Sequence, residues 1–331
     1  MPHWLYEQIR ATDLERSPQF ALQSTLNWMK ALSFEIVSEH GPTPQNQFDS
    51  CRQFFQQRFQ ASRVQRDLGD VFEALLQSLT HAMALATLVA GATGAQPWLY
   101  PGAIVWWYYG YYTAVHAMLH THGHGAATDT HGSTIRAFDG MVRTNMPHPL
   151  DMVATLQQAE TYTSSLPRHP AATPTSLQTA FGGTRGEAQG MLLEYLSGTA
   201  RYEVNAVKKR ILAEHHAFAD FRTNAARELR NRRLQNHLAH VSFMHCAFRY
   251  RGKANYRDAI YITYGQRTVP ADTFLANLAT SVIFAFVCGL AYVERQVGSP
   301  AVRAFLQDLR ANTRGLPNAP ASAQFWAQLN V

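Results

Sequence analysis

The stretch from residue 103 to residue 122 constrains the fold of this chain more than any other part of the sequence. At 3.6 residues per turn, its apolar side chains cover two neighbouring faces of a helix. These faces carry Trp107, Tyr111, Val115 and Met118 on one side and Tyr108, Tyr112 and Leu119 on the other. Such a helix leaves little surface for water, so we expect it in the middle of a helical bundle.

One narrow stripe of this helix is polar. Tyr109, Thr113, His116 and His120 follow each other at steps of four, three and four residues, which aligns them along one side of a helix. A polar stripe within an otherwise apolar helix indicates either a hydrogen-bonded buried network or a functional site, and the spacing leaves both open.

The remaining chain is mostly helical in pattern. We expect helices over 18–40, 45–66, 70–89, Pro101 to the end of the central stretch, a Ser133 cap to Val142, 150–161, 255–264, 272–297 and 302–309. Residues 187–250 are helical almost throughout, with weak interruptions at Gly198 and near Asp220. We identify no strand in this pattern, so the predicted fold class is all-α. Residues 163–186 are rich in Thr, Pro and Gly, which predicts a long exposed loop or insertion.

These patterns divide the chain into an N-terminal helical extension (1–66), a helical bundle (67–298) that holds the insertion, and a C-terminal helical tail (299–331). The three cysteines are odd in number and widely spaced, which indicates neither a disulfide framework nor a thiolate zinc site. We therefore expect a cytoplasmic protein. Residues 103–119 and 274–293 approach membrane-spanning length, but buried core helices have the same pattern, so no membrane insertion is expected.

Positive charge is concentrated in one part of the sequence. The chain has a net charge of +6, and residues 201–258 alone contain thirteen Lys or Arg against five Asp or Glu. A local excess of this size favours a polyanionic partner such as RNA.

Within this basic region, two arginines and two histidines share one face of a predicted helix. Arg230, Arg233, His237 and His240 are spaced by three, four and three residues. Arginine binds phosphate oxygens with a rigid fork of donors, and histidine exchanges a proton near neutral pH. These groups suffice for attack of an RNA 2′-hydroxyl on the adjacent phosphate without a metal ion.

The paired Tyr, the Ala-Val-His-Ala run of the central stretch and the following Thr130-His131 resemble the middle of a HEPN-superfamily helical bundle. Ribonucleases of that superfamily carry Arg, an adjacent polar residue and a His, and Arg230, Asn231 and His237 match this order. The resemblance implies that Arg230 holds the scissile phosphate, Asn231 orients it or the histidine, and His237 is the general acid and base.

The resemblance further implies a cofactor-free homodimeric endoribonuclease of the toxin or antiphage-defence type, with an antitoxin or sensor protein as a possible further partner. The residues expected to bind RNA around the catalytic set are Arg227, Arg233, His240, Lys208 and Lys209.

Two other functions are compatible with the sequence. The basic helix could be a non-catalytic surface for RNA, a nucleotide or a protein. Alternatively, histidines could bind a metal, with candidates at His116, His120, His122, His124 and His131, and further ones at His215, His216, His237, His240 and His245. The central helix contains no Glu in register with its histidines, so no metal ligand is predicted, and His116 is expected to be a hydrogen-bonded core residue.

Overall fold

The computed structural model describes residues 18–59, 68–91, 98–122, 130–158, 161–163, 169, 171–216, 219–252, 254 and 271–313. These residues are mostly helical and include one small antiparallel sheet. The helices are α2 (Pro18–His40), α3 (Pro44–Arg58), α4 (Leu68–Gly91), α5 (Leu99–His120), α6 (His131–Asn145), α7 (Arg185–Glu214), α8 (Asn224–His237), α9 (Phe243–Gly252), α11 (Ala271–Val297) and α12 (Ser299–Thr313). The strands are β1 (Val153–Gln158), β2 (Thr161–Thr163) and β3 (His240–Ser242).

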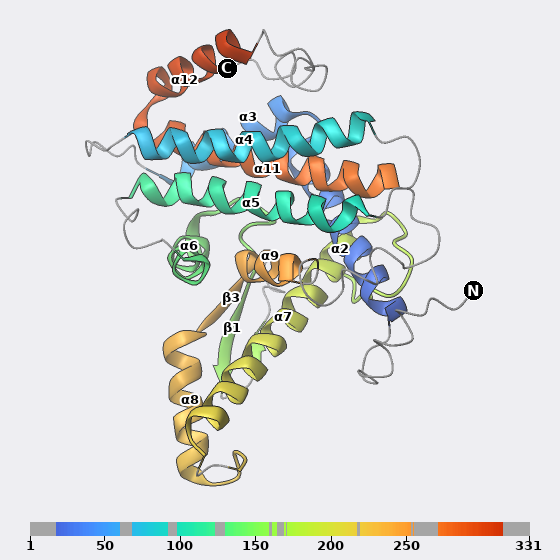
Figure 1. The fold of residues 1–331 in the computed structure, drawn as a ribbon, viewed down its shortest axis with the longest axis vertical. Helices are drawn as coiled ribbons and strands as arrows, with labels where there is room; N and C mark the ends of the chain where they lie inside the picture. Colours follow the sequence, from blue (N-terminus) through green and yellow to red (C-terminus); the bar gives the residue numbers. More distant parts are fainter. Residues whose placement is uncertain are drawn as a thin grey trace.

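Helices α4, α5 and α11 run side by side and form the centre of the bundle (Figure 1). Helix α11 also contacts α2 and α3, while α6 and α9 contact α5. Helix α12 follows α11 on the outer side, where Phe305 stacks on Phe72 of α4 with ring centroids 4.7 Å apart. The stretches of α5 and α11 are buried in the bundle, as their patterns predict, whereas α4 is partly exposed.

The central position of α5 confirms the expectation for this stretch. Trp107, Tyr108 and Tyr111 are fully buried, and the indole of Trp107 and the hydroxyl of Tyr111 both hydrogen-bond to Ser281 of α11, at 3.1 and 2.9 Å. Gly110 permits close contact between the two helices, because a Cβ at this position would lie 2.2 Å from a methyl group of Val282. Aromatic burial and one small residue thus fix the packing of α5 on α11.

The sheet corrects the prediction of a helix over residues 150–161. Strand β1 pairs with β2 and, on its other side, with β3, so that Ala154 lies opposite Val241. Val153 and Thr155 are half-buried and Ala154 is buried, which is the alternation of a strand. The extended conformation depends on a partner strand more than eighty residues away, which local periodicity does not reveal.

Most other helix boundaries agree with the sequence. The predicted break near Asp220 separates α7 from α8, whereas α7 continues through Gly198 and the run is broken again by β3. Gly41 and Gly298, with φ of +90° and +99°, follow the ends of α2 and α11, where a left-handed residue ends a helix easily. Helix α6 differs in detail, because Thr130 is its N-cap and Ser133 is the third helical residue of a reciprocal capping box. The predicted helix at 255–264 lies outside the described residues.

The described part of segment 163–186 contains the end of β2 and, after residue 171, an irregular and mostly exposed chain, as predicted. It is nevertheless anchored: Leu177 is buried, and the side-chain amide of Asn27 donates to the carbonyl oxygens of Leu177 and Thr179, at 2.9 and 2.6 Å. At its end, the Thr184 hydroxyl caps α7 by accepting a hydrogen bond from the Glu187 amide.

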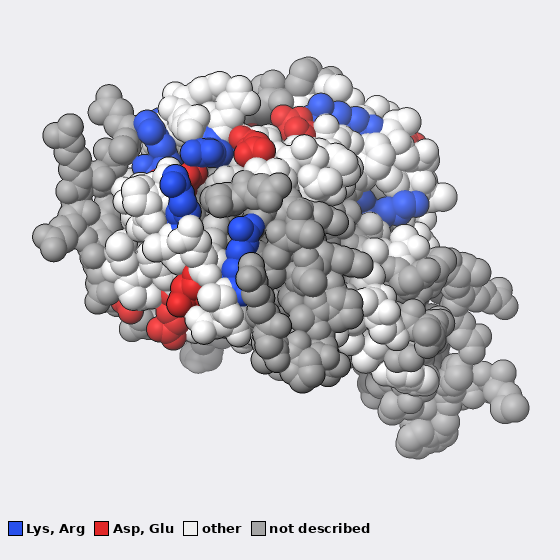
Figure 2. Space-filling model, turned by 90° about the horizontal axis from the view of Figure 1, so that it is seen from above, with Lys and Arg blue, Asp and Glu red and all other residues white. Residues whose placement is uncertain are grey.

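Helix α8 and the C-terminal half of α7 project away from the bundle, with β1 and β3 at the base of the projection (Figure 1). We call residues 201–238 the basic arm. Figure 2 shows a different face, seen from above, where the basic and acidic residues that are coloured lie interspersed.

Candidate functional site

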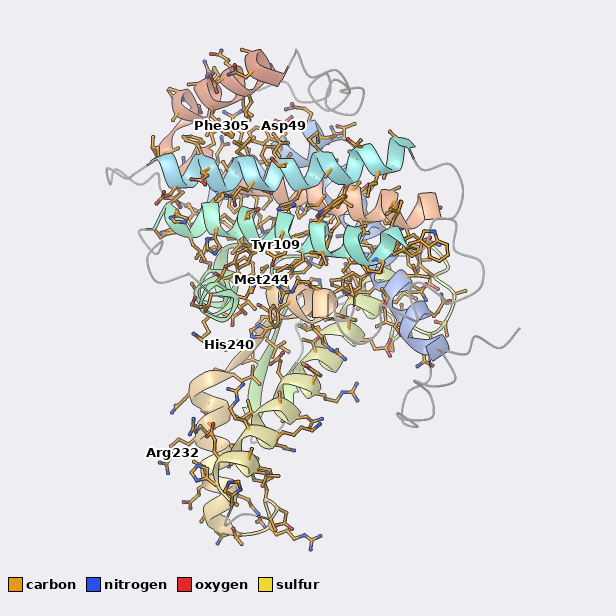
Figure 3. The ribbon with its side chains drawn as sticks, in the orientation of Figure 1. Asp49, Tyr109, Arg232, His240, Met244 and Phe305 are labelled. Carbon is orange, nitrogen blue, oxygen red and sulfur yellow. The ribbon has the colours of Figure 1, made fainter. Side chains whose placement is uncertain are left out.

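The basic arm carries the residues that the sequence predicts to bind RNA. Helix α8 starts at a Thr223 N-cap, and Ala226 and Leu234 are buried while most of its other side chains are exposed or half-buried. Exposed cations of the arm, from both of its helices, are Arg201, Lys209, Arg210, Arg222, Arg227 and Arg232. Arg232 lies on the side of α8 that faces away from α7 (Figure 3). Across the arm, nine Lys or Arg stand against four Asp or Glu.

The structure brings two of the three predicted catalytic residues together. The Arg230 guanidinium donates two hydrogen bonds to Asn231 Oδ1, from Nε at 3.2 Å and from Nη2 at 3.1 Å. The same guanidinium lies 5.6 Å from the centre of the Phe221 ring. His237 is the last residue of α8, and its side chain lies outside the described residues.

His240 does not extend the face of α8, which corrects the predicted row of four residues on one helix. The helix ends at His237, and His240 begins β3, where it lies opposite Thr155 of β1 (Figure 3). The reason is Leu238, whose φ of −147° and ψ of 41° turn the chain out of the helix so that the next residues can pair with β1.

Two of the predicted RNA-binding arginines make contacts within the arm. Arg233 forms an ion pair with Glu214 of α7 at 3.1 Å, and Arg227 donates hydrogen bonds to the carbonyl oxygens of Phe221 and Arg222. These contacts link α8 to α7 and to the turn between the helices. Of the predicted lysines on α7, Lys209 is exposed and Lys208 is half-buried.

A second group of polar residues, which the sequence did not single out, lies where α2, α7 and the loop before β1 meet. Glu35 and His169 are buried, His148 and Asp151 are half-buried, and Arg185 is exposed. We call Glu35, His148, Asp151, His169 and Arg185 the histidine–carboxylate cluster. Glu35 is fully buried, and its Oε1 accepts hydrogen bonds from Arg185 Nε at 3.0 Å and from the Gln189 amide at 2.8 Å. His148 Nε2 lies 3.1 Å from the same oxygen.

His148 is the centre of this cluster. Its Nδ1 lies 2.9 Å from Asp151 Oδ1, and its ring lies 4.4 Å from the ring of His169, measured between centroids. Burial alone would lower the pKa of His148, but hydrogen bonds to Asp151 and Glu35 outweigh burial and raise it to about 9. Burial would raise the pKa of Glu35, but its contacts with His148, Gln189 and Arg185 lower it.

A cavity of about 420 Å³ lies against this cluster. His148, Asp151 and His40 line it, together with Glu39 and Arg58. The ring of His40 is held by Ser50, at 2.8 Å from Nδ1, and by the backbone oxygen of His148. The cavity gives a small molecule or water access to His148 and Asp151.

The polar stripe of α5 is a hydrogen-bonded network over much of its length. His116 Nε2 lies 2.9 Å from Thr134 Oγ1, and the Thr113 hydroxyl donates to the Tyr109 carbonyl oxygen. His131 contacts the Tyr108 hydroxyl at 2.9 Å through Nδ1 and accepts from the Arg251 guanidinium at 3.0 Å through Nε2. His116 is hydrogen-bonded, as expected, but it is half-buried and does not belong to the fully buried core.

The histidines proposed as metal ligands do not form one group in the described chain. His122 contacts Tyr292, His120 lies 3.8 Å from Asp70, and His124 lies outside the described residues. Among the residues that the structure describes, the group with metal-binding donors close together is His148, Asp151 and His169.

In the part of the chain that the structure describes, two helices are long and apolar enough to cross a membrane, α4 over Leu68–Gly91 and α11 over Thr273–Val297. Most of α11 is buried within the bundle, whereas only a third of the most apolar window of α4 is buried. Buried core helices satisfy the same criteria of length and composition, so this finding does not place the chain in a membrane.

No protein-family model, curated protein or solved structure matches this chain.

Proposed function

We propose that the chain binds RNA along the basic arm and cleaves it without a metal ion. The observation that carries this proposal is the projecting arm itself, which carries exposed cations on both α7 and α8 together with the paired Arg230 and Asn231. Lys and Arg side chains that neutralise successive phosphates supply most of the affinity for a nucleic-acid backbone. A projecting and strongly cationic helical pair is well suited to that contact.

In the proposed reaction, Arg230 and His237 act as the HEPN resemblance implies, and the role of Asn231 follows from its contact with the Arg230 guanidinium. His237 takes the proton of a ribose 2′-hydroxyl, the oxygen attacks the adjacent phosphorus, and the bond to the 5′-oxygen breaks as that oxygen receives a proton. Arg230 stabilises the charge on the phosphate oxygens, and Asn231 holds the guanidinium in place. The products are a 2′,3′-cyclic phosphate and a 5′-hydroxyl.

The contact between Arg230 and Asn231 supports these roles. An arginine whose Nε and Nη2 are both held by Asn231 Oδ1 has a fixed guanidinium plane, and a fixed plane loses less conformational entropy when a phosphate binds. We propose that a second copy of α8 completes the cleft in a homodimer. The HEPN-type bundle, the cytoplasmic location and control by an antitoxin or sensor belong to the same proposal.

The alternative function is an arm that binds RNA without cleaving it. Both functions use the exposed cations of the arm, and only the cleavage function requires His237.

The two functions are separated by His237→Ala. Purified His237→Ala should no longer cleave RNA, whereas purified His216→Ala should cleave it as the wild type does. His216 is an exposed histidine elsewhere on the arm. RNA binding, measured by fluorescence anisotropy, should be unchanged in both variants. Equal cleavage by His237→Ala and the wild type would overturn the catalytic proposal and leave the binding function.

A further inference from the structure

We propose that His148, Asp151 and His169 bind one divalent first-row transition-metal ion. This site is separate from the proposed ribonuclease residues, which lie on α8. Its donors come from the loop before β1 and from residue 169. The candidate ligand atoms, one from each residue, all lie within 4.8 Å of one another, so modest side-chain movement brings each to the ~2.0–2.2 Å that imidazole and carboxylate ligands take.

The surroundings of His148 are those of a metal-bound histidine. Metal-binding histidines usually donate their second ring nitrogen to a carboxylate, which fixes the tautomer and aims the other nitrogen at the metal. Here His148 Nε2 lies 3.1 Å from Glu35 Oε1, and Glu35 is itself held by Arg185 and Gln189. With Nε2 protonated, the lone pair of Nδ1 faces Asp151, and a cation takes the place of the proton between them.

The charges of the cluster also favour a cation. Three carboxylates belong to or contact the cluster: Asp151 pairs with His148, and Glu35 and Glu39 both pair with the guanidinium of Arg185. Glu35 Oε2 is buried without a hydrogen-bond partner, which is costly for an ionised group. When His148 is a neutral ligand, these four charged groups sum to −2, which a divalent ion balances.

The site has an open side. The side chain of Asp151 is 20% exposed, and both Asp151 and His148 line the 420 Å³ cavity. Three protein ligands with a remaining position open to water are typical of catalytic zinc sites, and two histidines with one carboxylate are typical of non-haem iron. The donor set therefore selects Zn²⁺, Fe²⁺ or a similar ion over Mg²⁺ or Ca²⁺.

The first experiment titrates Zn²⁺ and Co²⁺ into the full chain after treatment with EDTA and dialysis, with binding measured by calorimetry. The wild type and His216→Ala should each bind one equivalent. Asp151→Asn, which keeps an oxygen to accept from His148, and His169→Gln should each lose that equivalent. Glu35→Gln should weaken binding by about 10- to 100-fold, as expected for a residue that orients a ligand.

The proposal is overturned if the wild type binds no stoichiometric metal, or if binding survives both Asp151→Asn and His169→Gln. It is also overturned if His216→Ala removes the binding, which would indicate adventitious contact with surface histidines. A second measurement needs no variant: the X-ray absorption spectrum of the zinc-loaded wild type should show two imidazoles, and a spectrum without imidazole scattering contradicts the site. RNA cleavage is assayed in EDTA, so the result of the cleavage assay does not depend on the result of the metal-binding titration.

Discussion

The guanidinium of Arg230 and the side-chain oxygen of Asn231 are joined by two hydrogen bonds on the projecting helix α8, at 3.2 and 3.1 Å. Neighbouring residues of a helix point in directions about 100° apart, so this contact requires the arginine to fold back along the helix surface. Phe221 supports it from the preceding turn, 5.6 Å from the guanidinium. The pair therefore presents a preset donor group within a cationic surface.

Substitution of Asn231 by Ala should slow RNA cleavage with little change in RNA affinity. The guanidinium loses its acceptor and becomes mobile, so the loss should fall on the rate constant, by roughly 10- to 100-fold, as for other residues that position a group. Single-turnover kinetics at saturating protein measure this rate, and Asn236→Ala, an exposed asparagine on the same helix, is the matched control. An equal loss in both variants would remove the special role of Asn231.

Arg232→Ala should reduce the salt dependence of RNA binding. Each phosphate contact that is lost lowers the slope of log K against log salt concentration by about 0.7 for a single strand. Arg303 on α12 is also exposed and lies outside the arm, so Arg303→Ala should leave the slope unchanged. Anisotropy titrations over a series of salt concentrations measure both slopes, and equal slopes for the two variants would argue against the arm as the RNA-binding surface.

Gly190→Ala should destabilise the fold, because a Cβ at this position would lie 1.8 Å from the carbonyl oxygen of Thr173. We expect a loss of about 1–3 kcal/mol, as for other overpacked positions. Gly140 in α6 has open space around it, so Gly140→Ala should stabilise the helix by up to about 1 kcal/mol. Urea unfolding of both variants measures these changes, and a neutral Gly190→Ala would show that Thr173 does not pack on α7 in this way.

His245 should make the protein less stable in mild acid. Burial, followed by the nearby His240, lowers its pKa from 6.5 to about 4, and its Nδ1 accepts from the Ser242 amide at 3.2 Å, which favours the neutral ring. The folded chain therefore binds this proton more weakly than the unfolded chain. The contribution of the neutral His245 ring to the free energy of unfolding is fully present above pH 6.5. It is lost as the pH falls toward about 4, and the loss is at most about 3 kcal/mol.

His245→Asn tests this pH dependence, because asparagine keeps an acceptor for the Ser242 amide and does not titrate. Its free energy of unfolding, measured in urea between pH 7 and pH 4, should fall less steeply than that of the wild type. Parallel curves for the two proteins would contradict the assignment of the acid sensitivity to His245.

The sequence predicts those parts of the fold that local pattern determines. The aromatic periodicity of α5 predicts its burial, and Gly41 and Gly298 predict helix ends, because hydrophobic spacing and left-handed glycine act within one or two turns. The strands were missed because β1 is stabilised by β3, and pairing across more than eighty residues leaves no mark on local periodicity.

The two candidate sites also differ in how far the sequence predicts them. Arg230 and Asn231 are adjacent in the chain, so their contact could be anticipated from the sequence. The histidine–carboxylate cluster joins Glu35 of α2 to Arg185 of α7, 150 positions later, through His148 in a loop. Only the packing of α2 against α7 brings these groups together, and a single sequence does not contain that information.

Metal-independent RNA cleavage by Arg230 and His237 is tested most directly by incubating the purified chain with total RNA in the presence of EDTA and mapping the ends of the fragments. We expect fragments with 2′,3′-cyclic phosphate and 5′-hydroxyl ends, produced by the wild type and His216→Ala but not by Arg230→Ala or His237→Ala. Intact RNA in the wild-type reaction, or cleavage that persists without Arg230 and His237, would contradict it.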